Sequence, residues 1–310
     1  MATRFKYLGI AFLAAAALGP RGVARGESLT GMLEGPGVVI HYARGTAGWA
    51  KRARDLLPSA NKNALDTLGM TTNRQVSIHL YATAKGFRQA TNYLPEDTLG
   101  VALPGANQIA IDCSKTTDFG NNSFNLTLRH EMIHIAFGRL HARTGQKVPL
   151  WFNEGVACMA MGRLKLGDPK QLVRAANTGG LFPLRELDPK FPPGRVHREL
   201  AYQQSESAAT FLVEQYGEDS VRRIVERMDS GQTFAGALAE ITGGADFEAQ
   251  WRDHVRRRYP LLSLLRNYFS LFTFLALFVI LAYIVYRARR RRLRKRWEAE
   301  EEFDDAGFYY

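Results

Sequence analysis

The sequence His130-Glu131-Met132-Ile133-His134 carries two histidines four residues apart. On a helix, residues at this spacing lie on the same face, with roughly 5–6 Å between their Cβ atoms. Both imidazoles can then reach one ion, at about 2.0–2.1 Å if the ion is zinc. Glu131 points about 100° around the helix, so it can approach a water on the ion without binding the ion itself. This division between ligands and a general base is typical of a zinc hydrolase.

A second stretch, Pro149-Leu150-Trp151-Phe152-Asn153-Glu154-Gly155, supplies a candidate for the third ligand. Catalytic zinc usually has three protein ligands and one open position, and two histidines with one glutamate form a known set. Glu154 comes twenty residues after His134, at the start of a second helical pattern over 154–161. The residues that break the helix between them are Gly138, Gly145 and Pro149. We therefore expect the chain to reverse and bring Glu154 back against the histidines.

These two motifs resemble those of the gluzincin zinc peptidases, the superfamily that includes thermolysin. The sequence is most similar to the bacterial group called peptidase MA-like, which carries the histidine motif, a proline, tryptophan and Glu-Gly element, and a later tyrosine. The corresponding residues here are Pro149, Trp151, Glu154, Gly155 and Tyr202. The resemblance covers 38–255. It implies an α+β, zincin-like fold with a mixed β-sheet N-lobe and a mainly helical C-lobe, in a peptidase domain over 27–260.

The resemblance also implies the reaction, which is hydrolysis of bonds in a peptide or protein substrate. One Zn2+ ion held by His130, His134 and Glu154 would polarise the scissile carbonyl and lower the pKa of its water to about 7. Glu131 would take the proton of this water and pass it to the leaving amine. Tyr202 is the expected hydrogen-bond donor to the oxyanion. The alternative for Tyr202 is a core tyrosine under the cleft.

The position one turn after Glu154 departs from the family pattern. Many thermolysin-like enzymes have an acid there that accepts a hydrogen bond from a metal-bound histidine, but this chain has Cys158. Backbone carbonyls or another acid must then take this role, or Asn153 helps to orient the site instead. Cys158 and Cys113 are the two cysteines of the chain. They either form a disulfide, as an exported protein permits, or remain two separate buried thiols.

The other histidines have weaker claims to a function. His79, His141 and His197 are expected to be surface or hydrogen-bonded residues, because two histidines and one glutamate already complete a ligand set. His197 is the reserve candidate for the oxyanion donor. No function is assigned to His41 or His254.

The chain before the metal motif alternates between strand and helix patterns. Strands are predicted at 38–42, 76–81 and 108–112, and helices at 49–68 and 85–92. By resemblance, the strand just before the metal helix is often the edge onto which an extended peptide adds itself. Residues 107–111 are given that role, with an ordinary core strand as the alternative.

The chain after the metal motif is mostly helical. The predicted helices span 156–166, 169–176, 200–216, 220–228, 234–241 and 247–258. Between the second and third of these, residues 179–195 are rich in Gly and Pro, and such a loop is expected to frame one wall of a cleft.

Both ends of the chain are predicted to direct it to a membrane. Residues 1–26 have the charged start and short apolar run of a signal peptide, with an uncleaved anchor as the alternative. Residues 268–286 carry no charge and are long enough for one transmembrane helix, with a buried core helix as the alternative. The basic cluster at 287–296 favours a cytoplasmic tail at 287–310. We therefore expect a single-pass protein of the cell membrane, embedded by one helix, with its peptidase domain extracytoplasmic.

The net charge of +11 does not indicate nucleic-acid binding. Twelve of the 41 basic residues lie in the leader and in 287–296, and six of the 30 acidic residues lie in the tail, so the middle is only about +5. Two functions remain: a membrane-anchored zinc metallopeptidase, or a catalytically weak or inactive metal-stabilised binding or scaffold protein of the cell envelope. Glu131 favours the enzyme, because a structural metal site has no use for a base. Cys158 slightly favours the scaffold.

Overall fold

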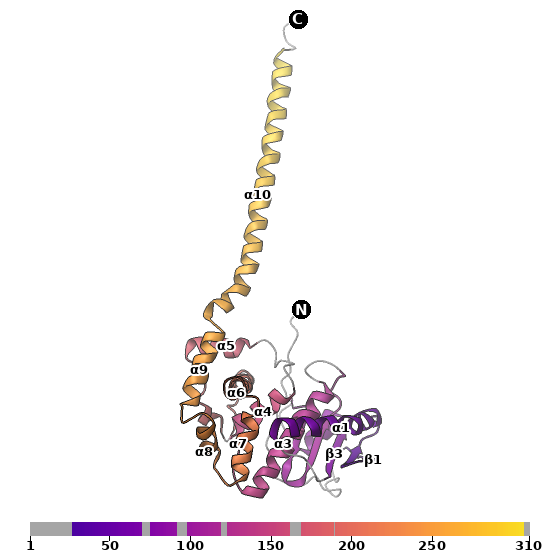
Figure 1. The fold of residues 1–310 in the computed structure, drawn as a ribbon. Coiled ribbons are helices and arrows are strands. Elements are labelled where there is room, and N and C mark those ends of the chain that lie inside the picture. Colours follow the sequence, from indigo (N-terminus) through magenta and orange to yellow (C-terminus); the bar gives the residue numbers. More distant parts are fainter. Residues whose placement is uncertain are drawn as a thin grey trace. The chain divides into compact units, whose positions relative to one another are not determined.

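A computed structural model describes residues 27–69, 75–91, 98–118, 123–161, 169–188 and 190–306, but not the side chains of 261–272 and 298–306. The chain divides into two units, Met1–Arg258 and Tyr259–Tyr310. Within its described part, the first unit has the mixed α+β architecture that was predicted, with a five-stranded sheet and many helices (Figure 1). The predicted signal peptide at 1–26 lies outside the described residues.

The strands of the sheet are β1 (Gly31–Gly35), β2 (Val38–Tyr42), β3 (Val76–Tyr81), β4 (Gly100–Leu103) and β5 (Gln108–Asp112). They lie in the order β1-β2-β3-β5-β4. Strands β2, β3 and β5 are parallel, whereas β1 and β4 run antiparallel to their neighbours. The predicted strands correspond to β2, β3 and β5. The sequence pattern did not indicate β1, which begins and ends with glycine, or β4, which has only four residues.

The edge strand on the side of β5 is β4, so the edge role predicted for 107–111 is wrong. β5 is paired on both sides, with β3 and with β4. The chain reverses between β4 and β5 through a short 3-10 helix, η1 (Pro104–Ala106), and Asn107, which has a positive φ of 57°. Asparagine tolerates this left-handed conformation better than most residues. The reversal places β4, the earlier strand, outside β5.

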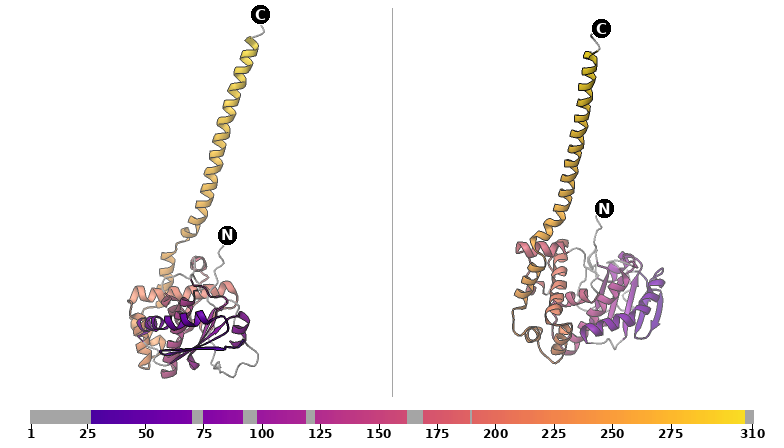
Figure 2. Two further views of the ribbon diagram at one scale, coloured as in Figure 1. Left: turned by 90° about the vertical axis from the view of Figure 1, so that its right-hand side faces the viewer. Right: turned by 45° about the horizontal axis from the view of Figure 1, so that its top comes forward.

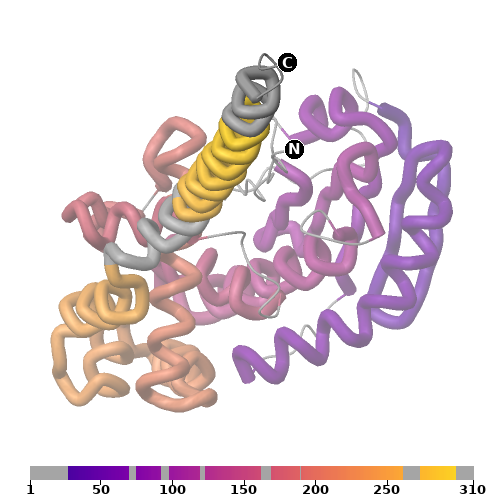
Figure 3. The backbone as a smooth tube through the Cα atoms, turned by 90° about the horizontal axis from the view of Figure 1, so that it is seen from above, coloured from indigo at the N-terminus to yellow at the C-terminus, as the bar shows by residue number. Residues whose placement is uncertain are grey.

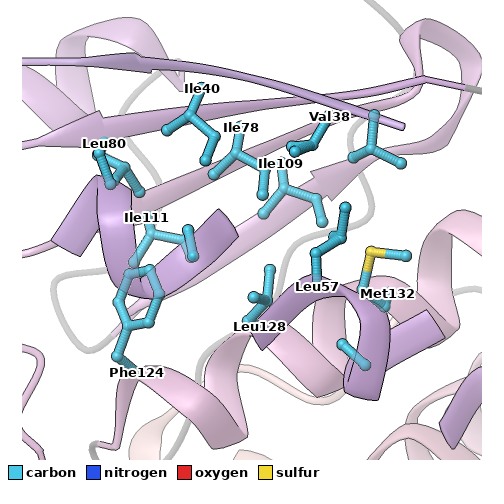
Figure 4. Close-up of a cluster of buried hydrophobic side chains, with 14 of the residues drawn as sticks. Val38, Ile40, Leu57, Ile78, Leu80, Ile109, Ile111, Phe124, Leu128 and Met132 are labelled. Atoms are coloured by element: carbon cyan, nitrogen blue, oxygen red, sulfur yellow. The ribbon is translucent and has the colours of Figure 1, made fainter. Parts of the chain in front are cut away.

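Helices α1 (Ala47–Leu68) and α3 (Phe124–Thr144) cover one face of the sheet. The buried side chains that meet there include Ile40, Ile78 and Ile109 from the strands, Leu57 from α1, and Leu128 and Met132 from α3 (Figure 4). Met132 lies in the middle of the metal motif, roughly 200° around the helix from both His130 and His134. Packing Met132 into this core therefore turns the two histidines away from the sheet.

The remaining helices of the first unit lie mainly after α3. They are α2 (Ala84–Ala90), α4 (Leu150–Ala160), α5 (Lys170–Thr178), α6 (Arg195–Tyr216), α7 (Ser220–Asp229), α8 (Phe234–Ile241) and α9 (Phe247–Arg258), with a 3-10 helix η2 (Leu184–Leu187). The right-hand view of Figure 2 shows the indigo and purple strands on one side of the magenta segment that holds α3 and α4, and the orange helices on the other. The backbone tube of Figure 3 has the same order of colours. The metal motif and Glu154 thus lie between the sheet and the helical half.

The predicted transmembrane helix at 268–286 is wrong. The second unit contains this stretch within one helix, α10 (Leu261–Ala306). Across the described residues, no helix combines the length and the hydropathy that crossing a membrane requires. The predicted cell-membrane localisation, with the first unit outside and 287–310 in the cytoplasm, is wrong for the same reason.

Candidate metal centre

Helix α3 carries the first two candidate ligands, His130 and His134, in the interior of the first unit. The two side chains are 0% and 1% exposed, and their ring centroids lie 4.7 Å apart at an interplanar angle of 76°. Burial lowers the pKa of His134 to about 4 and the pKa of His130 well below 6.5, with the neighbouring His134 adding to the shift at His130. Both imidazoles are therefore neutral near pH 7, which is the form that binds metal ions.

Helix α4 brings Glu154 to the two histidines. Glu154 Oε2 lies 3.5 Å from His130 Nε2 and 3.6 Å from His134 Nε2. Two ligand atoms around a tetrahedral zinc ion, each about 2.0–2.1 Å from it, are roughly 3.3–3.4 Å apart. The ligand atoms of the three residues all lie within 4.8 Å of one another, so the cluster could hold a metal ion. The structure thus brings together the three residues that the sequence predicted as ligands.

The chemistry of the cluster fits a divalent cation. Glu154 is 1% exposed, and neither of its carboxylate oxygens has a hydrogen-bond partner among the described residues. His130 Nε2 is likewise buried without a partner there. A buried polar group left unsatisfied costs about 1–3 kcal/mol, and more if it is charged. Burial, together with the nearby charge of Glu131, raises the pKa of Glu154 well above 4.5. A bound cation would satisfy these atoms and favour the ionised carboxylate.

Glu131 lies between the histidine helix and the edge strand β4. It is fully buried, and a Cβ atom on Gly100 of β4 would lie 2.9 Å from Glu131 Oε1. Any residue larger than glycine at position 100 would therefore displace the carboxylate of Glu131 from its present position. Burial raises the pKa of Glu131 to about 8, although the backbone of Ala102 offsets part of the shift. The charge of Glu131 in turn contributes to the raised pKa of Glu154. Sequence reasoning missed Gly100, because nothing local marks a glycine that faces a helix distant in the chain.

Asn153, the residue before Glu154, orients His134. Its Oδ1 atom lies 2.8 Å from His134 Nδ1, and both side chains are buried. Because the amide oxygen accepts, His134 Nδ1–H donates, which leaves the lone pair of Nε2 on the side of Glu154. This is the orienting role that was considered for Asn153. One stretch of α4 therefore supplies both a candidate ligand and the group that fixes the tautomer of another.

The cysteine one turn after Glu154 is a buried, free thiol. Cys158 and Cys113 are both buried and do not form a disulfide with each other. Burial raises the pKa of Cys158 well above 9, and Glu206 of α6 and Glu154 add to the shift. Glu206 is a half-buried acid whose own pKa is raised to about 7 by burial. The sequence analysis did not identify Glu206 as a residue near the site. It lies one helical turn after Tyr202, and therefore on the same face of α6.

His130 has a backbone group beside it in place of the acid found in related enzymes. The backbone of Ala157 opposes part of the fall in the pKa of His130, although neither ring nitrogen of His130 has a hydrogen-bond partner of normal geometry among the described residues. Ala157 follows Glu154 by three residues and precedes Cys158 directly. A backbone carbonyl was one of the substitutes expected where the family pattern has an acid.

Gly155 sets how closely α4 and α6 approach. A Cβ atom on Gly155 would lie 2.2 Å from the backbone oxygen of Ser205 and 3.1 Å from the Cβ of Ala209, both on α6. Backbone atoms cannot move aside as a flexible side chain can. The close packing of α4 against α6 therefore requires glycine at the position after Glu154. The same packing holds α4 where Glu154 can reach the two histidines.

Replacing Gly155 by Ala is expected to lower the free energy of unfolding by about 1–3 kcal/mol, because α4 and α6 must separate to admit one methyl group. Denaturant unfolding of the purified chain measures this change. Gly48→Ala is the matched control, since a Cβ atom at this glycine of α1 meets nothing within 4 Å. The control should leave stability unchanged or raise it by up to about 1 kcal/mol. Equal stability of the two variants would contradict the packing argument.

Tyr202 lies on α6 in an apolar cluster beside the metal residues. It is 2% exposed and packs with Leu99, Leu126, Cys158 and Met161, and its ring meets that of Phe191 edge-on at 4.9 Å. Cys158 follows Glu154 by one turn and Leu126 precedes His130 by one turn. The cluster therefore adjoins α3 and α4, the two helices that carry the candidate ligands. His197, the reserve donor, is exposed near the start of α6, and its ring contacts that of Phe182.

Comparison with known families agrees with this geometry. The model of the peptidase MA superfamily matches residues 60–257, which is more than half of the chain. The matched span contains α3 and α4, which carry the candidate ligands, and continues into α9. A search of curated proteins finds no match.

Proposed function

The chain belongs to the peptidase MA superfamily, and we propose that it is a zinc-dependent peptidase of the gluzincin type. The observation that carries this proposal is the convergence of His130, His134 and Glu154, with the carboxylate of Glu131 buried on the next position of the same helix. Two imidazoles and one carboxylate are a known ligand set for catalytic zinc, and they leave one coordination position open. The proposed substrates are peptides or proteins.

The residues of this site have separate tasks in the proposed reaction. Zinc, when bound, supplies Lewis acidity toward the peptide carbonyl and toward a water molecule. Glu131 accepts the proton of the attacking water as the new C–O bond forms, and delivers it to the leaving nitrogen as the C–N bond breaks. The products are a carboxylate and an amine. Asn153 holds the His134 ring in the tautomer that presents Nε2.

Tyr202 is the proposed donor to the oxyanion that develops on the substrate. Its ring belongs to the apolar cluster that adjoins both metal helices. A hydroxyl donor in a water-excluded site stabilises such a charge more strongly than a donor in water does. The same burial also suits a tyrosine that only packs. A Tyr202→Phe variant separates the two roles, because it removes the donor and keeps the ring.

The substrate backbone is proposed to bind along the outer edge of β4. In the described sheet, β4 pairs on one side only, with β5. Gly100 on this strand lies against Glu131. An extended peptide that adds to β4 would place its backbone near the general base, and backbone hydrogen bonds bind peptides without strict sequence choice.

Removal and return of the metal test the proposed function. The purified full-length chain is expected to hold about one zinc ion and to cleave casein or a peptide library. A chelator should abolish cleavage, and added Zn2+ should restore it. Mg2+ serves as the control, because it prefers oxygen ligands and should not restore activity. Cleavage that survives complete removal of the metal would refute the proposal.

A further inference from the structure

A row of three potential metal ligands crosses the sheet on the face away from α1 and α3. Met32 of β1 pairs with His41 of β2, and His41 pairs with His79 of β3. Side chains of directly paired residues lie on the same face of a sheet, and neighbouring strands are about 4.8 Å apart. Ile40 and Ile78, which precede the two histidines, point into the core on the opposite face. The row therefore lies outside the metal centre on α3 and α4.

The two histidines of this row stack on each other. Their ring centroids are 5.1 Å apart and their planes differ by 27°. His79 is only 8% exposed, yet its Nε2 atom has no hydrogen-bond partner within the described part of the chain. Buried imidazole nitrogens are normally satisfied. His79 is therefore not a surface residue, and the unpaired Nε2 atom requires an explanation.

Burial keeps the His79 ring in its neutral form, which is the form that binds metal ions. It lowers the pKa of His79 to about 4, and the neighbouring His41 adds to the shift. The ring is thus neutral at pH 7, with a lone pair on one nitrogen. His41 is half-buried, and no hydrogen bond to its ring is found among the described residues. Its χ2 torsion is soft, so the ring can turn its nitrogen toward an ion shared with His79.

Met32 adds a thioether at the outer end of the row. It is 60% exposed, which is unusual for a large apolar side chain of the first unit. Its unbranched side chain has three rotatable bonds, so the sulfur can adapt to a ligand on the neighbouring strand.

We propose that Met32, His41 and His79 form a second metal site, separate from the first, that binds monovalent copper. A thioether selects soft ions such as Cu+, and imidazole binds copper well. Ca2+ and Mg2+ prefer oxygen ligands, which this row does not offer. The proposal rests on the sheet alone and does not depend on peptidase activity.

Competition with a colorimetric Cu+ chelator under anaerobic, reducing conditions tests the site. The full-length chain is first loaded with zinc to occupy the α3 and α4 centre, and Cu+ is then titrated. One Cu+ per chain is expected to bind. His41→Ala and Met32→Leu should each weaken Cu+ binding by at least about 10-fold, the effect known for changes around a metal site. Met32→Leu keeps the size and apolar character of the side chain.

His141→Ala is the matched control, because this exposed histidine lies on α3, outside the row. It should bind Cu+ as the unaltered chain does. Zinc content and thermal unfolding confirm that each variant is folded. Absence of Cu+ binding beyond the zinc site would overturn the proposal. So would equal affinity of the unaltered chain and His41→Ala, or a Met32→Leu variant that binds Cu+ normally.

Discussion

Replacing Glu131 by Gln is expected to lower the rate of peptide hydrolysis by about 10²–10⁴-fold, the usual contribution of a general base. The amide has nearly the same shape as the carboxylate, so it fits the space that Gly100 leaves beside the helix. It cannot accept a proton from water. Because Glu131 is not one of the three clustered ligands, the zinc content should stay near that of the unaltered chain. Steady-state cleavage and metal analysis of the same sample measure both effects.

Glu206→Gln is the control for this substitution. Burial raises the pKa of Glu206 as it does that of Glu131, but Glu206 is only half-buried and lies on α6. Its loss should leave the rate within a few-fold of the original. Equal activity of Glu131→Gln and the unaltered chain would remove the enzymatic interpretation. A chain that holds zinc but shows no cleavage even with Glu131 present would favour the metal-stabilised scaffold.

Replacing Glu154 by Gln is expected to abolish tight metal binding and the stability that depends on it. The side chain keeps its volume but loses the negative charge between His130 and His134. Free zinc at 1,000 times its dissociation constant stabilises a folded protein by about 4.1 kcal/mol. At roughly 2–4 °C per kcal/mol for a domain of this size, zinc should raise the Tm of the unaltered chain by about 8–16 °C. The same addition should leave the Tm of Glu154→Gln almost unchanged.

The metal-free proteins give a second readout for Glu154. Loss of the carboxylate removes a buried, unsatisfied acid whose neighbour Glu131 disfavours its charge. We therefore expect the metal-free variant to be at least as stable as the metal-free original chain. Glu131→Gln should keep the zinc-dependent rise in Tm, which separates a ligand from a base. A zinc-dependent rise that persists in Glu154→Gln would exclude Glu154 as a ligand.

Local patterns predicted most helices of the first unit, but α4 begins at Leu150, six residues before the predicted start at 156. The predictions at 234–241 and 247–258 agree with α8 and α9 to the residue, because apolar spacing along a helix depends on neighbouring residues alone. The start of α6 was missed by five residues, since Gly194, which precedes it, lies in a stretch rich in Gly and Pro. The membrane span was predicted from the uncharged length of 268–286 and the basic cluster after it, and the described part of α10 does not bear it out.

The amino-acid sequence by itself determined which residue types form the candidate metal centre. The spacing of His130 and His134 and the residue types around Glu154 are local properties of two helices, so they could be read directly. Only the tertiary structure decided which strand is the edge, why Gly100 and Gly155 must be glycines, and that His41 and His79 stack. Each of these depends on contacts between segments far apart in the chain. Strand pairing and helix packing create such contacts, and no pattern within one segment specifies its partner.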